Sequence, residues 1–183
     1  MTLFFHIAPP ALRGRAIATL GRWLPDKEHQ EKRPPVSPEI LDRLKALWEF
    51  RANLASGATG SVPFQTELSE FGWWFASGAF DEAWSLAQLQ KALRLAKTVI
   101  PQFRVTRQLA ELAQRFPLQC IQCARVIAEN DKQGWETLGS KNDFRTIISA
   151  ALKSGNGEAR DEADGLVQYL VGRGDFEYRT LLS

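Results

Sequence analysis

Apolar residues recur along this chain at the three- and four-residue spacing of an amphipathic α-helix, with polar residues between them. Gly, Pro and Asn gather in short stretches between these periodic segments and predict turns. Strict alternation of apolar and polar residues, which would indicate a half-buried strand, is hard to find over more than about four residues. The pattern therefore predicts an all-helical protein, with only residues 1–7 as a possible extended segment.

The first predicted helix covers residues 10–24, and Pro25 ends it. Its apolar residues share one stripe, which we expect to be buried, Trp23 included. A charged linker with two prolines follows at residues 26–36. We therefore expect an N-terminal helix (1–25), a linker (26–36) and a helical-repeat domain (37–183). The stripe consists of Leu12, Ala16, Leu20, Trp23 and Leu24.

Helix pairs are predicted along the rest of the chain. Ser37 and Asp81 are suited to cap helix starts, and Gly78 suits a left-handed cap. Phe64, Leu68, Phe71 and Phe75 are expected on one helix. Later helices are expected over residues 105–116, 120–127, 144–152 and 159–170, and a short helix over 176–182 could cover the last open face.

The turns near Ala79, Pro117 and Gly157 lie about 40 residues apart, as in HEAT and armadillo repeats. We expect stacked antiparallel helix pairs in a right-handed, HEAT- or armadillo-like solenoid. An irregular α-helical bundle is the alternative, because helices of ordinary length give a similar period. The N-terminal helix has no obvious polar cap, which suggests either that a longer protein continued upstream or that this helix docks on another chain.

Charge is nearly balanced overall, at +2, but residues 88–125 carry seven basic side chains against Glu111 alone. Such a segment could attract an anionic partner, or could be solvated helix surface. Only two cysteines are present, which argues against a secreted disulfide scaffold. No apolar stretch approaches the ~20 residues of a membrane-spanning helix. We therefore expect a cytoplasmic protein.

Several stretches resemble a known class of helical region. They are EFGWWFASGAFDEAW (70–84), LAELAQRFP (109–117), DKQGW (131–135) and the segment 151–182. Together they are similar to the C-terminal helical region of long bacterial proteins that often carry an upstream nucleotide-binding or effector domain, some linked to defence against phage. The resemblance implies a helical fold and a bacterial origin. It carries over no catalytic residue, because the upstream domain and its GxxxxGK[ST] loop are absent from this sequence.

The sequence offers few candidates for catalytic or metal-binding residues. Cys120 and Cys123 form a CxxC motif without the second ligand pair that zinc needs, and helical spacing predicts packed, reduced thiols. Glu67 with Glu70, and Asp81 with Glu82, are interpreted as solvated helix residues and caps. His6 and His29 lie outside the repeats. We therefore expect no catalytic, metal or cofactor site, and no enzyme.

Binding of a protein partner is the favoured function, as a scaffolding module that is part of, or truncated from, a larger protein. Trp73 and Trp74 cannot share one helix face, so one is expected in the core. The other is expected either to fill the groove to the next helix or to lie partly exposed as a partner contact. Trp48 and Trp84 are expected in the core, and Trp135 is expected to pin the linker 131–141. Sequence-tolerant nucleic-acid binding through residues 88–125 is the alternative. The candidate partner-binding residues are Trp73, Trp74, Lys91, Arg94, Lys97, Arg104 and Arg107.

Overall fold

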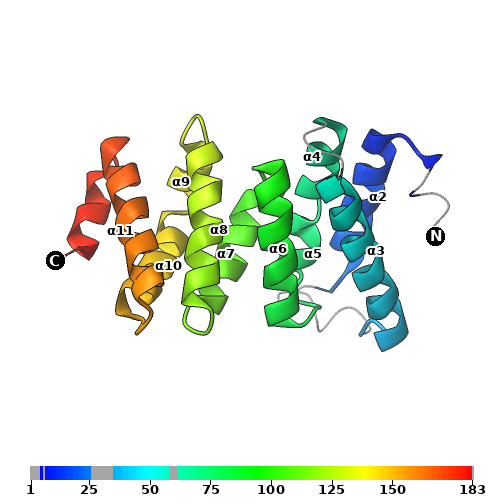
Figure 1. Cartoon of the computed structure of the whole chain (residues 1–183), viewed down its shortest axis with the longest axis horizontal. Helices are drawn as coiled ribbons and strands as arrows, with labels where there is room; N and C mark the ends of the chain where they lie inside the picture. Colours follow the sequence, from blue (N-terminus) through cyan, green and yellow to red (C-terminus); the bar gives the residue numbers. More distant parts are fainter. Residues whose placement is uncertain (1–4, 6, 26–34, 58–61, 183) are drawn as a thin grey trace. The chain divides into compact units, whose positions relative to one another are not determined.

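The computed structural model describes Phe5 and residues 7–25, 35–57 and 62–182. Over these residues the chain is all-helical, with 78% helix and no strand, which confirms the prediction of an all-helical protein. The chain divides into two compact units, Met1–Pro101 and Gln102–Ser183. Figure 1 labels the helices of both units.

Several helices of the first unit begin or end at residues that the sequence marks as caps. Asp81 caps the last of them by accepting a hydrogen bond from the Trp84 backbone N–H at 2.8 Å, and Gly78 adopts the expected positive φ of 66°. The Ser37 hydroxyl accepts from the Ile40 N–H at 3.4 Å. The helices are α2 (Pro10–Trp23), α3 (Pro38–Gly57), α4 (Val62–Ser69), α5 (Gly72–Ala76) and α6 (Glu82–Ala96).

An aromatic cluster around Trp48 holds this unit together. The Trp48 ring stacks on Phe71 at a centroid distance of 5.0 Å and meets Trp74 edge-on at 6.0 Å. Phe80 and Trp84 also meet the Trp48 ring edge-on, at 6.0 and 5.5 Å. Trp48 and Trp74 are buried as core residues, whereas Trp84 is half-buried at the margin of the cluster. Phe71, Trp74 and Phe80 thus form a buried aromatic core together with Trp48 of α3.

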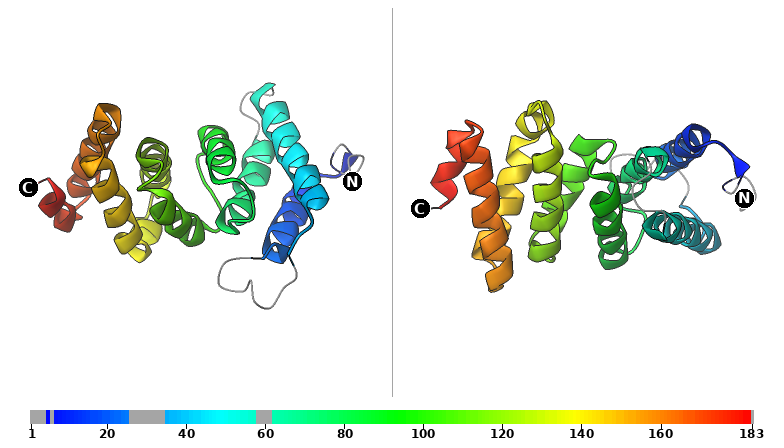
Figure 2. Two further views of the ribbon diagram at one scale, coloured as in Figure 1. Left: turned by 90° about the horizontal axis from the view of Figure 1, so that it is seen from below. Right: turned by 45° about the horizontal axis from the view of Figure 1, so that its top comes forward.

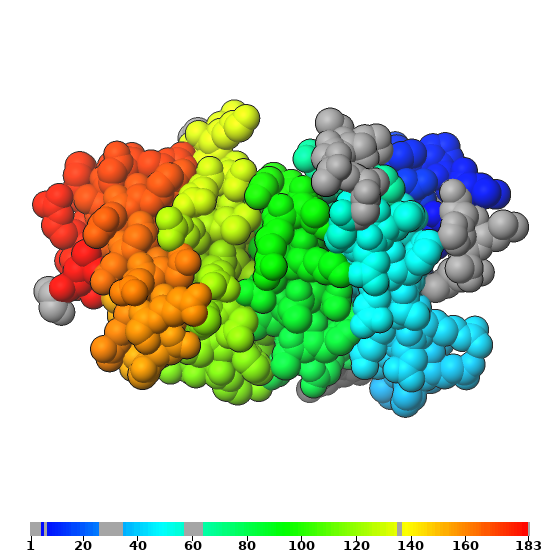
Figure 3. Space-filling model, viewed as in Figure 1, coloured from blue at the N-terminus to red at the C-terminus, as the bar shows by residue number. Residues whose placement is uncertain are grey.

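The margin of the cluster is a polar seam between α3 and α6. The Trp84 indole N–H donates to the Glu49 carboxylate at 2.8 Å, and the Lys45 ammonium lies 5.7 Å from the Trp84 ring. The side chain of Lys91 donates to that of Asn53. Figure 3 shows α3 and α6 lying side by side on the face in view.

The segment from Phe64 to Phe75, expected as one helix, is two helices. The chain breaks between Ser69 and Gly72, where the Ile100 N–H donates to the Ser69 carbonyl at 2.9 Å. The Ile100 carbonyl comes so close to Gly72 that a Cβ there would lie 2.5 Å from it. Hydrogen bonding from a distant segment thus outweighs the local periodicity, because it satisfies a carbonyl that a continuous helix would use itself.

The prediction for the buried face of α2 is wrong for Leu12 and Trp23, although Leu24, directly after the helix, is buried as expected. Leu12 and Trp23 are 47% and 53% exposed, whereas the face against the unit is formed by Arg13, Gly14, Ile17, Ala18 and Gly21. A Cβ on Gly21 would lie 2.5 Å from the Trp73 Cβ, so glycine is what lets α2 approach α5 this closely. Small residues, rather than the larger apolar ones, therefore set the orientation of α2.

The second unit contains two helix hairpins and a terminal 3-10 helix. Figure 2 shows α10 and α11 side by side, joined by residues 154–156. Pro117, expected at a turn, occupies the first turn of α8. The predicted terminal helix is confirmed as η2, whose Tyr178 is buried on α10 and α11. The elements are α7 (Gln102–Leu112), α8 (Pro117–Asn130), α9 (Trp135–Gly139), α10 (Lys141–Lys153), α11 (Gly157–Gly172) and η2 (Phe176–Leu181).

The connection after α8 is ordered by Asp131. Its carboxylate accepts from the Thr137 N–H at 2.8 Å, from the Thr137 hydroxyl at 2.9 Å and from the Gly134 N–H at 2.9 Å. Arg173 donates to the Asp131 carbonyl at 2.7 Å. The side chain of Trp135, which was expected to pin this connection, lies outside the described residues.

Candidate functional site

Of the two adjacent tryptophans, Trp74 belongs to the core and Trp73 reaches the surface. Trp74 is fully buried, and its indole N–H donates to the Ile17 carbonyl of α2 at 2.7 Å. Trp73 is half-buried, with the Arg22 guanidinium carbon 5.3 Å from its ring centroid. Any contact that this pair makes with a partner therefore falls to Trp73.

Three of the predicted basic residues lie on α6 or at its end. Arg94 is exposed, whereas Lys91 is half-buried and engaged with Asn53. Lys97 is exposed and ends the helix with a left-handed φ of 64°. Arg94 and Lys97 are accordingly the cations that α6 offers to solvent.

Arg104 and Arg107 belong to α7 in the second unit. The guanidinium of Arg104 lies 6.0 Å from the ring of Phe103, which is itself exposed. Arg107 is exposed and faces Asp143. Burial raises the pKa of Asp143, while the positive charge of Arg107 opposes that rise and the negative charge of Glu111 adds to it.

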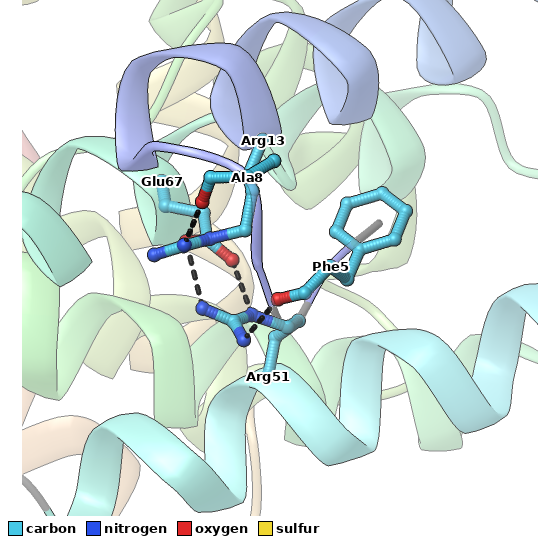
Figure 4. Close-up of polar contacts among 5 residues, drawn as sticks. All are labelled: Phe5, Ala8, Arg13, Arg51 and Glu67. Atoms are coloured by element: carbon cyan, nitrogen blue, oxygen red, sulfur yellow. Dashed lines mark hydrogen bonds and ion pairs between the residues drawn. The ribbon is translucent and has the colours of Figure 1, made fainter. Parts of the chain in front are cut away.

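A buried charge cluster in the first unit is a feature that sequence reasoning missed (Figure 4). The carboxylate of Glu67, 0% exposed, receives two hydrogen bonds from Arg51 and one from Arg13 at 2.7 Å. Arg51 also donates to the Phe5 carbonyl at 3.0 Å, and Arg13 donates to the Ala8 carbonyl. Two arginines thus clamp the chain before α2 onto α3 and α4.

The interpretation of Glu67 as a solvated residue is therefore wrong. A signal for this burial is present in the sequence, because Glu67 falls between Phe64 and Leu68 on the apolar stripe of its own segment. Arg51 likewise occupies the α3 stripe, between Trp48 and Ala55. A charged residue at a stripe position indicates a buried ion pair once a residue of opposite charge occupies a matching position elsewhere.

Its neighbour Glu70 is half-buried. Burial raises the pKa of the Glu70 carboxyl, although the charge of Arg22 and a hydrogen bond from Trp73 oppose the rise. Glu67 and Glu70 thus differ in surroundings and partners, and the arrangement gives them separate roles rather than a shared acid–base pair.

The CxxC thiols are packed, as predicted. Cys120 and Cys123 are free cysteines buried on α8, and burial raises the pKa of Cys120 to about 12. A thiol with such a pKa is a poor nucleophile at neutral pH. Across the described ranges no group of three or more His, Cys, Asp or Glu residues could hold a metal ion.

The exposed apolar side chains of α2 are a second feature that sequence reasoning assigned to the core. Leu12, Ala16, Thr19, Leu20 and Trp23 fall within about 100° of the helix circumference, and each is exposed or half-buried. They lie opposite the face that contacts α4 and α5. We call these five residues the α2 outer stripe.

Comparison with protein-family models, curated proteins and solved structures gave no match to this chain. In the part of the chain that the structure describes, no helix is both long enough and apolar enough to cross a membrane.

Proposed function

We propose that this chain is a non-enzymatic helical module that binds a protein partner or scaffolds an assembly. The observation that carries the proposal is the α2 outer stripe, where Leu12 and Trp23 are about half-exposed on one helix face. Clustered apolar side chains at a surface are typical of protein-binding sites, and tryptophan is a common energetic anchor there.

The buried polar groups support a binding role over a catalytic one. The Glu67 carboxylate already accepts hydrogen bonds from Arg13 and Arg51. The Asp131 carboxylate already accepts hydrogen bonds from Thr137 and Gly134. Glu67 joins helices that are far apart in the sequence, Asp131 orders the connection after α8, and both side chains are buried. A general acid or base, in contrast, must reach a substrate proton from a cleft.

The proposal also names Trp73, Arg94 and Lys97 as candidate partner contacts of the first unit. Arg104 and Arg107 are separate candidate contacts of the second unit. Hairpins α7–α8 and α10–α11 suit the HEAT- or armadillo-like repeat that the sequence spacing suggests. The two free, buried cysteines suit a reducing, cytoplasmic setting.

Nucleic-acid binding is the weaker candidate, because part of the basic segment is neutralised within the chain. Arg125 donates to Glu129 at 2.8 Å and to Glu162 at 2.7 Å. Lys91 keeps its charge, but it is half-buried and its ammonium donates to the neutral Asn53 side chain. A low-salt gel shift with single-stranded and double-stranded oligonucleotides tests this alternative, which requires retardation that weakens as salt rises.

Quantitative affinity capture from cells that carry the native gene tests the proposed function. The bait is the full chain, and the comparison baits are Leu12→Ser/Trp23→Ser and Arg94→Glu/Lys97→Glu. The matched control is Ile40→Ser/Leu54→Ser, which removes apolar side chains that are 42% and 43% exposed on α3. We expect a partner that is retained by the full chain and the control, is depleted by at least one test bait, and binds again as purified protein. Equal recovery on all baits would contradict the proposal.

A further inference from the structure

The orientation of α2 fixes its outer stripe toward solvent. On the inner face, Arg13 is tied to Glu67 at 2.7 Å and Gly21 lies against Trp73 and Trp74. Rotating α2 to bury Leu12 and Trp23 would break a buried ion pair and drive larger side chains into Trp73. The exposure of the stripe is therefore a consequence of the fold of the first unit.

The charged residues of α2 itself are all of one sign. Helix α2 contains Arg13, Arg15 and Arg22 and no acidic residue. Arg13 is buried with Glu67, whereas Arg15 and Arg22 are exposed along one edge of the stripe, seven positions apart. Glu70 lies near Arg22. A partner that covers the apolar side chains would therefore meet the positive charge of Arg15. It would also meet the charge of Arg22, which Glu70 partly offsets.

The charge pattern separates the possible occupants. A second copy of α2 packed on the same stripe would bring Arg15 and Arg22 against the same arginines, without a carboxylate from either helix. A helix with an apolar seam and acidic flanks would bury Leu12, Leu20 and Trp23 and pair with the arginines. The stripe runs about 16 Å along α2, which matches roughly three turns of such a helix.

We propose that the α2 outer stripe docks an amphipathic helix with acidic flanks from a partner protein. The inference rests on the proposed binding function and names its site and the chemistry of the partner. Leu12 and Trp23 supply the apolar anchors, and Arg15 selects the sign of the flanking charge.

Designed peptides test this directly with the full chain. One 21-residue helix carries Leu at the a and d heptad positions and Glu at e and g, and its matched partner carries Lys in place of Glu. Fluorescence anisotropy at low salt is expected to give at least tenfold tighter binding of the Glu peptide, and that preference should shrink as salt is raised.

Variants locate the binding. Leu12→Ser/Trp23→Ser is expected to weaken binding of the Glu peptide at least tenfold, and Arg15→Glu at least threefold. Ile40→Ser/Leu54→Ser and Lys153→Glu, which change exposed residues elsewhere, should leave it unchanged. Circular dichroism melts of every variant confirm that the fold is retained.

Several outcomes would overturn the inference. One is equal affinity for the two peptides, and another is an affinity for the Glu peptide that the α2 substitutions leave unchanged. A third is a wild-type dimer in sedimentation that becomes a monomer in the Leu12→Ser/Trp23→Ser variant. Binding of phosphatidylserine vesicles but not of the Glu peptide would assign the stripe to a lipid surface instead. If the Glu peptide fails while captured partners depend on Arg94 and Lys97, the docking inference is wrong and the proposed function stands.

Discussion

Arg51 of α3 and Glu67 of α4 form a two-armed ion pair in which both side chains are almost completely removed from solvent. The same carboxylate also binds Arg13, so one negative charge joins three helices. An isolated buried charge is costly, and this arrangement is stable because every oxygen of Glu67 is hydrogen-bonded. The pair therefore defines how α2, α3 and α4 assemble.

Replacing Glu67 with Gln tests this role. The variant keeps the side-chain volume but leaves two buried guanidinium groups without a counter-charge, so we expect a loss of about 3–5 kcal/mol in the free energy of unfolding. Urea denaturation followed by circular dichroism measures it. The control is Glu39→Gln, whose partner Arg43 is exposed, and which should change stability by under about 1 kcal/mol. Similar values for the two variants would contradict the role assigned to Glu67.

Two glycines of α2 make a matched pair for testing its packing. A Cβ at position 21 would clash with Trp73 and Trp74 at 2.5 and 2.7 Å, whereas a Cβ at Gly14 meets Glu70 and Glu67 at 3.7 and 3.8 Å. We expect Gly21→Ala to destabilise by about 1–3 kcal/mol. Gly14→Ala should be neutral or stabilising by up to about 1 kcal/mol, because Ala favours the helix. Thermal melts compare the two, and the reverse order would show that α2 packs differently.

The fold was more predictable than the orientation of its parts. The helix at 82–96, with Asp81 as its cap, follows from local signals that tertiary contacts do not oppose. The break between Ser69 and Gly72 could not be foreseen, because its cause is the distant Ile100 backbone. The apolar periodicity predicts which residues of a helix share a face, but the helix that packs against it determines which face is buried.

Helix α2 shows this limit most clearly. Its two faces are both largely apolar in the sequence, and the larger side chains of Leu12 and Trp23 favoured the wrong one. Glycines that allow close approach and a buried Arg13 decided the outcome. Apolar periodicity identified the helix, but it also led to the α2 outer stripe being assigned to the core.

Asp131 predicts a pH dependence of stability in the second unit. Burial acts to raise the pKa of its carboxyl, but hydrogen bonds from Thr137 and Gly134 and the charge of Arg173 together hold the pKa below its ordinary value. A lowered pKa in the folded state contributes stability that is present above about pH 4 and is lost as pH falls through the folded pKa.

The variant Asp131→Asn replaces one acceptor oxygen with a donor and removes the charge. We expect it to lose about 1–3 kcal/mol of unfolding free energy at pH 7. The difference in unfolding free energy between the variant and the wild type should become smaller as pH falls from about 5 to about 2, because the wild-type carboxyl becomes protonated. Urea denaturation at a series of pH values measures this difference. A difference that stays constant with pH would contradict a stabilising role for the ionised Asp131 carboxylate.

The thiols of α8 provide a probe of local opening. Because burial raises the pKa of Cys120 to about 12 and Cys123 is also buried, neither thiol should react with an aromatic disulfide reagent at pH 8 in the native protein. Both should react in concentrated guanidinium chloride. Rapid reaction of either thiol under native conditions would show that α8 is more open than the structure indicates.

The α2 outer stripe is expected to lie against a protein partner in the cell. Its most direct test places a photo-crosslinking amino acid at Thr19, within the stripe, and separately at Ala46, an exposed position of α3, in cells that carry the native gene. Irradiation is expected to give one discrete adduct with another protein from position 19, with a lower yield in the Arg15→Glu background, and none from position 46. Adducts only between copies of this chain, or equal labelling from both positions, would contradict the claim.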